Sequence, residues 1–139
     1  MRASDGIFDV KKDREFRKEA LITKISDLPC ACVPMGALTF VRGKIELQVD
    51  DFADQPGVWI LAVDGDIARI TGADTRSMHA SAQWWERPGN SDRHDHLAHL
   101  LQGTLKAGNS VELFGCQPAG ASYVATAREW RQAFSFAWA

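Results

Sequence analysis

The sequence is poor in cysteine and tyrosine, with three cysteines and one tyrosine among 139 residues. An odd number of cysteines does not suit a disulfide framework, so we expect free thiols in a reducing compartment. No apolar run approaches the length of a membrane span, and the first residues lack the apolar core of a signal peptide. We therefore expect a cytoplasmic protein.

The sequence also lacks an excess of charge of one sign, because its formal net charge at pH 7 is only −2. This balance excludes a bulk electrostatic argument for binding nucleic acid, so such binding would need a local basic patch. Hydrophobic residues make up 45% of the chain and charged residues 24%, as in ordinary globular proteins. The length is sufficient for a sizeable core.

The clearest pattern that is present lies between residues 57 and 72. Seven apolar or small residues, 57–63, predict a strand that is covered on both faces. Asp64-Gly65 predicts a tight turn, because glycine accepts the positive φ that such a turn needs. Residues 67–71 then supply the returning strand of a hairpin.

A helix is expected directly after this hairpin, over residues 75–86. Asp74 or Thr75 is a suitable N-cap. Arg76 and His79 are three residues apart, so they would share one face of that helix near its beginning. A basic pair at a helix N-terminus is suited to holding a phosphate.

Two further helices and one strand are predicted in the second half of the chain. A leucine stripe predicts a helix over 94–107, with Ser91 or Asp92 as its cap, and Val111–Phe114 reads as a short strand. The last helix, 121–134, has an apolar face with Glu129 beside it. Glu129 is suited to holding a divalent cation, and the alternative is a surface acid near basic neighbours.

The first fifty residues predict a helix followed by a hairpin. The helix spans Asp9–Ile25, and its mixed-charge face includes Lys11, Lys12 and Arg14, which either meet solvent or contact phosphate. Two strands, 37–41 and 44–49, flank a turn at Arg42-Gly43. We therefore divide the chain into an N-terminal helix-plus-hairpin extension, 1–50, and a domain over 52–139.

Two motifs resemble metal sites without completing one. Cys30 and Cys32 are too closely spaced for a typical zinc site and need two more ligands, so we interpret them as small buried residues. His96 and His99 share a helical face, but two histidines alone do not make a site, and exposed or capping histidines are the simpler interpretation.

The order strand, strand, helix, helix, strand, helix from Pro56 onward resembles the GIY-YIG nuclease superfamily. This resemblance implies an α/β (α+β) fold, with a small central antiparallel or mixed sheet flanked by helices. The residues that carry it are Pro56-Gly57-Val58-Trp59, Ile70-Thr71-Gly72, Arg76 with His79, His96-Leu97, 106–108, 111–114 and Glu129-Trp130.

The resemblance implies a divalent-metal-dependent endonuclease site. Arg76 would steady the scissile phosphate, Glu129 would hold Mg²⁺ or Mn²⁺, and His79 would complete the catalytic set. We also assign substrate contact to Arg69, Arg76 and Trp59. The expected partner is nucleic acid, with DNA favoured over RNA, and a homodimer is allowed.

The two tyrosines of the family signatures are absent from this chain. Trp59 stands at the first and Ile70 at the second, and neither side chain accepts a proton from water. We therefore expect an impaired site, and whether the chain is an enzyme stays open. The alternatives are a member that binds nucleic acid or a protein without catalysis, and an unrelated small α/β domain for protein interaction or assembly.

Overall fold

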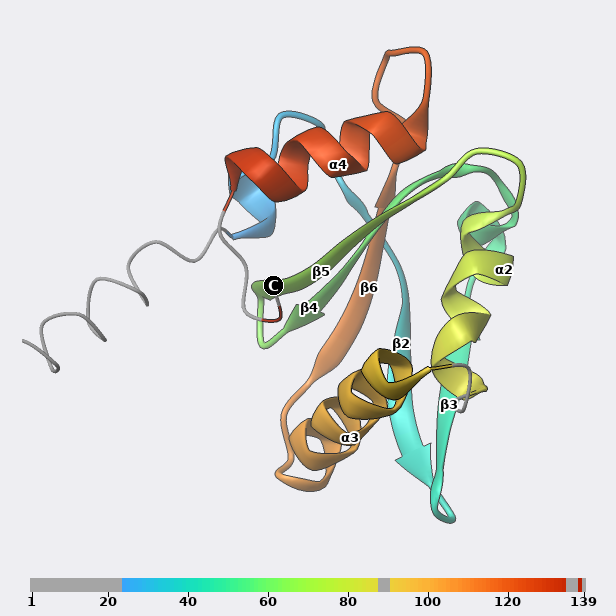
Figure 1. Cartoon of the computed structure of the whole chain (residues 1–139), viewed down its shortest axis with the longest axis vertical. Coiled ribbons are helices and arrows are strands. Elements are labelled where there is room, and N and C mark those ends of the chain that lie inside the picture. Colours follow the sequence, from blue (N-terminus) through green and yellow to red (C-terminus); the bar gives the residue numbers. More distant parts are fainter. Residues whose placement is uncertain (1–23, 88–90, 135–137, 139) are drawn as a thin grey trace, which may run out of the picture.

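The computed structural model describes residues 24–87, 91–134 and 138. Its centre is a five-stranded sheet in the order β3-β2-β6-β4-β5, and every neighbouring pair is antiparallel (Figure 1). The strands are β2 (Val33–Val41), β3 (Lys44–Val49), β4 (Gly57–Val63), β5 (Asp66–Ala73) and β6 (Val111–Cys116).

Helices cover both faces of this sheet, which confirms the predicted α+β class. On one face lie α2, its 3₁₀ continuation η3 and α3, packed on a core that includes Trp59, Leu61 and Leu113. On the other face lie α4 and the short turn η1. The helical elements are η1 (Ile25–Asp27), η2 (Asp51–Asp54), α2 (Met78–Ala82), η3 (Gln83–Glu86), α3 (Asp92–Lys106) and α4 (Tyr123–Ala133).

The β4–β5 hairpin forms as predicted. Asp64 and Gly65 have φ values of 51° and 88°, and six of the seven β4 residues are buried. Successive β4 side chains alternate between the faces, so Trp59 points toward α2 and α3 while Ile60 points toward α4. This alternation decides which hairpin residues can reach a site on each face.

The predicted hairpin around Arg42-Gly43 is also confirmed, although β2 begins earlier than expected, at Val33. It is not isolated from the rest of the fold, because β2 pairs with β6 along the same sheet. The predicted strand at 111–114 is therefore the central strand, with β2 on one side and β4 on the other.

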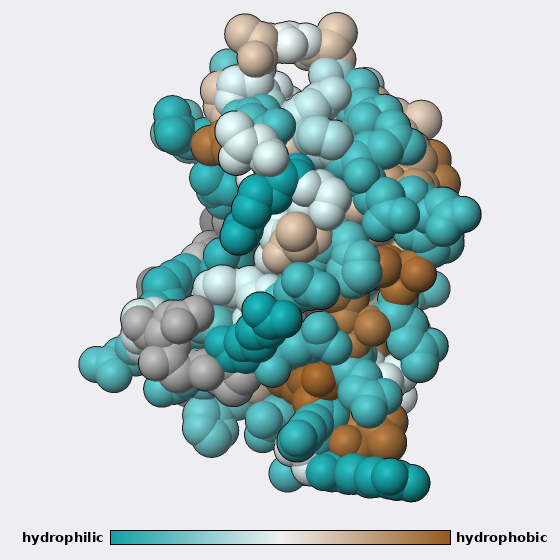
Figure 2. Space-filling model, turned by 90° about the vertical axis from the view of Figure 1, so that its right-hand side faces the viewer, coloured by the Kyte–Doolittle hydropathy of each residue, from teal (hydrophilic) through white to brown (hydrophobic). Residues whose placement is uncertain are grey.

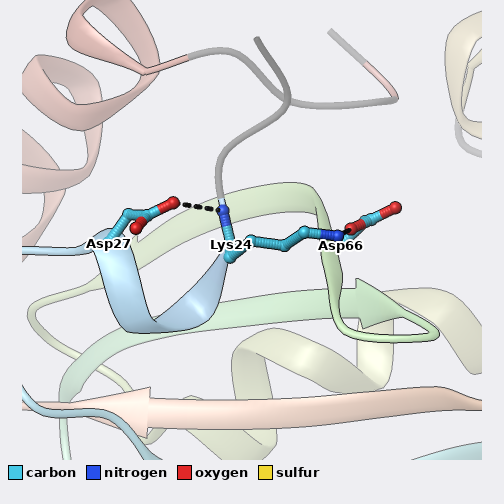
Figure 3. A network of polar contacts seen from close by, with 3 residues as sticks. All are labelled: Lys24, Asp27 and Asp66. Carbon is cyan, nitrogen blue, oxygen red and sulfur yellow. Dashed lines mark hydrogen bonds and ion pairs between the residues drawn. The ribbon is translucent and has the colours of Figure 1, made fainter. Parts of the chain in front are cut away.

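The predicted N-terminal helix, Asp9–Ile25, lies outside the described residues except at its end. There, Lys24 forms a β-bridge with Asp66, and Ile25 begins η1 instead of continuing a helix. The Lys24 ammonium pairs with the Asp66 carboxylate, while its backbone N–H donates to Asp27 at 3.0 Å (Figure 3). These contacts attach η1 to the start of β5.

The prediction of a helix beginning at 75 was wrong by three residues. Ser77 is the N-cap of α2, and its hydroxyl accepts from the backbone N–H of Ala80. Asp74 is unavailable as a cap there, because its carboxylate accepts from the Ser122 hydroxyl at 2.6 Å and from the backbone N–H of Tyr123 at 2.6 Å. It therefore serves the start of α4, on the other side of the sheet.

The outer edge of β5 is covered by contacts from distant segments. Arg131 donates to the Ile70 carbonyl at 2.8 Å, and the backbone N–H of Trp138 donates to the Ala68 carbonyl at 3.2 Å. Edge strands that keep their carbonyls engaged in this way are poor templates for pairing with another chain.

The surface on the side of α2 and β3 is mainly hydrophilic, with small apolar patches between polar side chains (Figure 2). Within the described part of the chain, no helix combines the length and the apolar character needed to cross a bilayer.

Candidate phosphate-binding site

A pocket of about 470 Å³ lies between β5 and the α2–η3–α3 layer. This volume is within the range of small-ligand sites. Its wall combines aromatic and cationic side chains, and none of the described aspartates or glutamates lines it. The lining residues are Trp59, Arg69, Thr71, Gly72, Arg76, Ser81, Trp84, Trp85, Ser91, Arg93, His94 and Leu97.

The sheet supplies one side of the pocket through two cross-strand pairs. Trp59 faces Thr71 across the hairpin, and Leu61 faces Arg69. Trp59 is only 3% exposed, and its indole N–H donates to the Ser81 hydroxyl at 2.8 Å. The indole is therefore held in place by the sheet below and by α2 beside it.

The helical layer supplies the opposite side, where two aromatic rings stack. The rings of Trp84 and His94 lie 3.6 Å apart with an interplanar angle of 6°. His94 is completely buried, and its Nε2–H donates to the Trp84 carbonyl at 2.7 Å. Ser91 caps α3 and positions His94 in the first turn, because its hydroxyl accepts from the His94 backbone N–H.

The cationic residues of the pocket are Arg69, Arg76 and Arg93, which come from three different segments. Burial lowers the pKa of Arg69, and the positive charges of Arg93 and Arg131 lower it further. In residues 24–87, 91–134 and 138, no carboxylate lies within 4.0 Å of these pocket arginines. An anion bound in the pocket would offset the repulsion between Arg69 and Arg93.

Three of the sequence-predicted site residues, Trp59, Arg69 and Arg76, meet in this pocket. Arg76 precedes the N-cap of α2, so the expected helical pair of Arg76 and His79 does not form. His79 does not line the pocket; its Nδ1 lies 3.8 Å from the Asp54 carboxylate on η2.

Glu129 is exposed on α4, which covers the opposite face of the sheet. Among the described residues, no group of three or more histidines, cysteines or acids is placed to hold a metal ion. Over the part of the chain that the structure describes, the donor set of the pocket has three guanidiniums and no carboxylate, which fits an anion and does not fit a divalent cation.

Ile70, which stands at the second signature tyrosine, is buried in the core beneath α4. The residue that faces the pocket beside Trp59 is Thr71. A tyrosine at position 70 would therefore place its phenol on the wrong side of the sheet.

Cys30 and Cys32 are half-buried and pack against the core beneath α4. A hydrogen bond with Cys116 lowers the pKa of the Cys32 thiol and raises that of Cys116. His96 and His99 are exposed on α3, away from the pocket described above.

Sequence reasoning missed Trp84, Arg93 and His94 as site residues. The sequence did contain a pattern that places His94 on the inward face of its helix. His94 lies one helical turn before the core position Leu97 and two turns before Leu101. Trp84 and Arg93 had no such signal, since neither belongs to an apolar stripe.

The geometry defines an α+β domain with an arginine-lined pocket beside an edge hairpin. Among solved structures, this chain is similar to a mutant of bacteriophage T4 EndoII, a GIY-YIG family endonuclease. The TM-score is 0.51 and the identity 16%, over 63% of this chain and 66% of that chain. No family model and no curated protein matches this sequence. The chain has a GIY-YIG-like fold, which confirms the predicted resemblance.

Proposed function

We propose that this GIY-YIG-like domain binds nucleic acid by holding backbone phosphates in the arginine pocket. The observation that carries the proposal is the convergence of Arg69, Arg76 and Arg93 on one pocket, whose lining includes no acidic side chain from the described residues. Guanidinium groups match phosphate oxygens in geometry and charge, and these pairs are among the stronger hydrogen bonds in proteins. The likeness to a phage endonuclease supports nucleic acid, with DNA as the expected form, over other phosphates.

Binding rather than hydrolysis is the proposed activity. Hydrolysis of a phosphodiester requires a proton acceptor for water and stabilisation of the leaving group. The pocket has an indole at Trp59 in place of a phenol, and Glu129 lies on the other face of the sheet. The arginines need neither group in order to hold a phosphate.

The test is fluorescence anisotropy with labelled DNA at several salt concentrations. Three phosphate contacts predict a slope of log affinity against log salt of roughly −2 to −3. Arg76→Ala should weaken binding by about 5- to 150-fold, the range for a charge-assisted hydrogen bond, and reduce the slope by about one. Lys44→Ala is the matched control, because it removes one positive charge at the β3 edge of the sheet.

Equal losses in Arg76→Ala and Lys44→Ala would contradict the proposal, because binding would then depend on overall charge alone. Absence of binding to single-stranded, duplex and branched DNA and RNA would also contradict it. That second outcome would favour the alternative of a protein-interaction or assembly module.

A further inference from the structure

Trp84 occupies an unusual position at the junction of two depressions. It lines the arginine pocket and also a neighbouring hollow of about 220 Å³, which includes Gln83 and Arg87. Arg76 lines both depressions as well. An aromatic ring and a guanidinium are therefore shared by two adjoining concave surfaces.

The Trp84 ring is held rigidly although it is only half-buried. One of its faces is covered by the parallel His94 ring, with the two ring centroids 3.6 Å apart, and it makes a T-shaped contact with Trp85 at a centroid distance of 4.9 Å. Glu86, two residues later, accepts from the Leu47 backbone N–H of β3 at 3.0 Å and so fastens η3 to the sheet. An indole that is already packed on other rings can stack on a ligand with little further loss of side-chain conformational entropy.

We propose that the pocket accepts an unpaired nucleotide, with its base stacked on the partly exposed Trp84 ring and its phosphate on the arginines. This inference rests on the proposed function and specifies its substrate class as single-stranded nucleic acid. Stacking of bases on aromatic side chains, combined with a basic groove for the backbone, is the common physical basis of single-strand binding.

The composition of the pocket favours an unpaired base over a paired one. Bases in a duplex are already stacked on both faces, so they present only their edges and the backbone to a protein. The partly exposed Trp84 ring gains little from a duplex backbone, whereas a volume of about 470 Å³ is enough for one nucleotide. Arg87, in the adjoining hollow, is placed to contact the next phosphate of the strand.

The experiment compares an oligothymidylate, a hairpin duplex of equal charge and free thymidine monophosphate, with anisotropy and intrinsic tryptophan fluorescence as readouts. Trp84→Leu should weaken binding of the single strand by roughly 5- to 150-fold and leave duplex binding within twofold. Trp84→Phe, which keeps an aromatic face, should retain most of the single-strand affinity. Circular dichroism melting checks that both variants are folded.

Unchanged single-strand affinity in folded Trp84→Leu would overturn the inference, and so would equal losses on the single strand and the duplex. Equal affinity for the free mononucleotide and the oligonucleotide would overturn the assignment to a strand. Arg76→Ala separates the two proposals: loss of binding to every nucleic acid in that variant, with no effect of Trp84→Leu, retains phosphate binding and rejects base stacking.

Discussion

Gly72 lets the start of α4 cross β5 at a separation that no side chain tolerates. A Cβ at this position would lie 2.3 Å from the Tyr123 carbonyl oxygen and 2.6 Å from the Val124 Cα, both of which are backbone atoms. Backbone cannot rotate away as a flexible side chain can, so the helix itself would have to move.

We expect Gly72→Ala to lower the free energy of unfolding by about 1–3 kcal/mol, the range for overpacking. Gly103→Ala is the control, because Gly103 lies within α3 and a Cβ there has no atom within 4 Å. That change should raise stability by about 0.5–1 kcal/mol through helix propensity. Urea denaturation measures both, and a neutral Gly72→Ala would contradict the close approach.

Arg69 is the residue at which binding and stability oppose each other. Its guanidinium is partly buried and close to the like charges of Arg93 and Arg131, which is why its pKa is lowered. We expect Arg69→Gln to raise the denaturation midpoint at low salt while weakening DNA binding several-fold. The stability gain should shrink at high salt, because screening weakens the repulsion.

Lys44→Gln serves as the reference for this trade-off, since it removes a positive charge on an exposed part of β3. It should change neither the denaturation midpoint nor the affinity for DNA appreciably. A lower midpoint in Arg69→Gln at every salt concentration would show that Arg69 contributes packing instead of repulsion.

At the scale of elements, α4 depends on Asp74, a residue that lies outside it. The Ser122 hydroxyl, followed by the backbone N–H groups of Tyr123 and Val124, holds the pKa of the Asp74 carboxyl below its usual value. A lowered pKa in the folded state means that the carboxylate contributes stability above its unfolded pKa of about 3.9, and that this contribution is lost as the pH falls through the folded value.

We therefore expect Asp74→Asn to lower the melting temperature at pH 7. The difference from the unmodified protein should shrink as the pH falls below about 4, because the carboxylate of the unfolded chain then takes up a proton, and it should be lost once the pH has fallen through the lower pKa of the folded state. Glu46→Gln, on the exposed face of β3, should show neither effect. If the melting temperatures of Asp74→Asn and the unmodified protein differ by the same amount down to pH 2, the Asp74 charge does not stabilise the start of α4.

At the scale of the whole molecule, Arg76 and Glu129 belong to segments on different faces of the sheet, although Arg76 also lines a hollow with Val124 at the start of α4. Arg76 lies in the pocket on the α2–α3 face, while Glu129 is exposed on α4 across the sheet. Loss of a general base alone costs roughly 100- to 10,000-fold in rate. We expect no cleavage of plasmid DNA in a nicking assay with Mg²⁺ or Mn²⁺.

Glu129→Gln should leave DNA affinity unchanged, because the carboxylate lies outside the pocket that we propose to hold phosphate. A gel-based nicking assay tests for cleavage, and anisotropy on the same variant tests the affinity for DNA. Metal-dependent cleavage that disappears in Glu129→Gln would contradict the proposed binding function and restore the catalytic assignment of Glu129.

The sequence was sufficient to predict several local features of this protein, although it misplaced the starts of α2 and β2. Asp64-Gly65 determines the β4–β5 turn, because its conformation requires positive φ at both positions. Apolar periodicity determines α3 and α4, and Ser91 caps α3 as expected. Each of these elements depends on residues within a few positions of one another. Their order along the chain was enough to indicate the GIY-YIG-like fold.

Only the tertiary structure decided which side chains share the pocket. Asp74 caps α4 instead of the nearby α2, and Arg93 and His94 meet Arg69 from a distant helix. Such contacts depend on which face of a strand a residue occupies and on how helices pack across the sheet. Local patterns carry no information about that packing, because it is set by the burial of apolar surface between segments far apart in the chain.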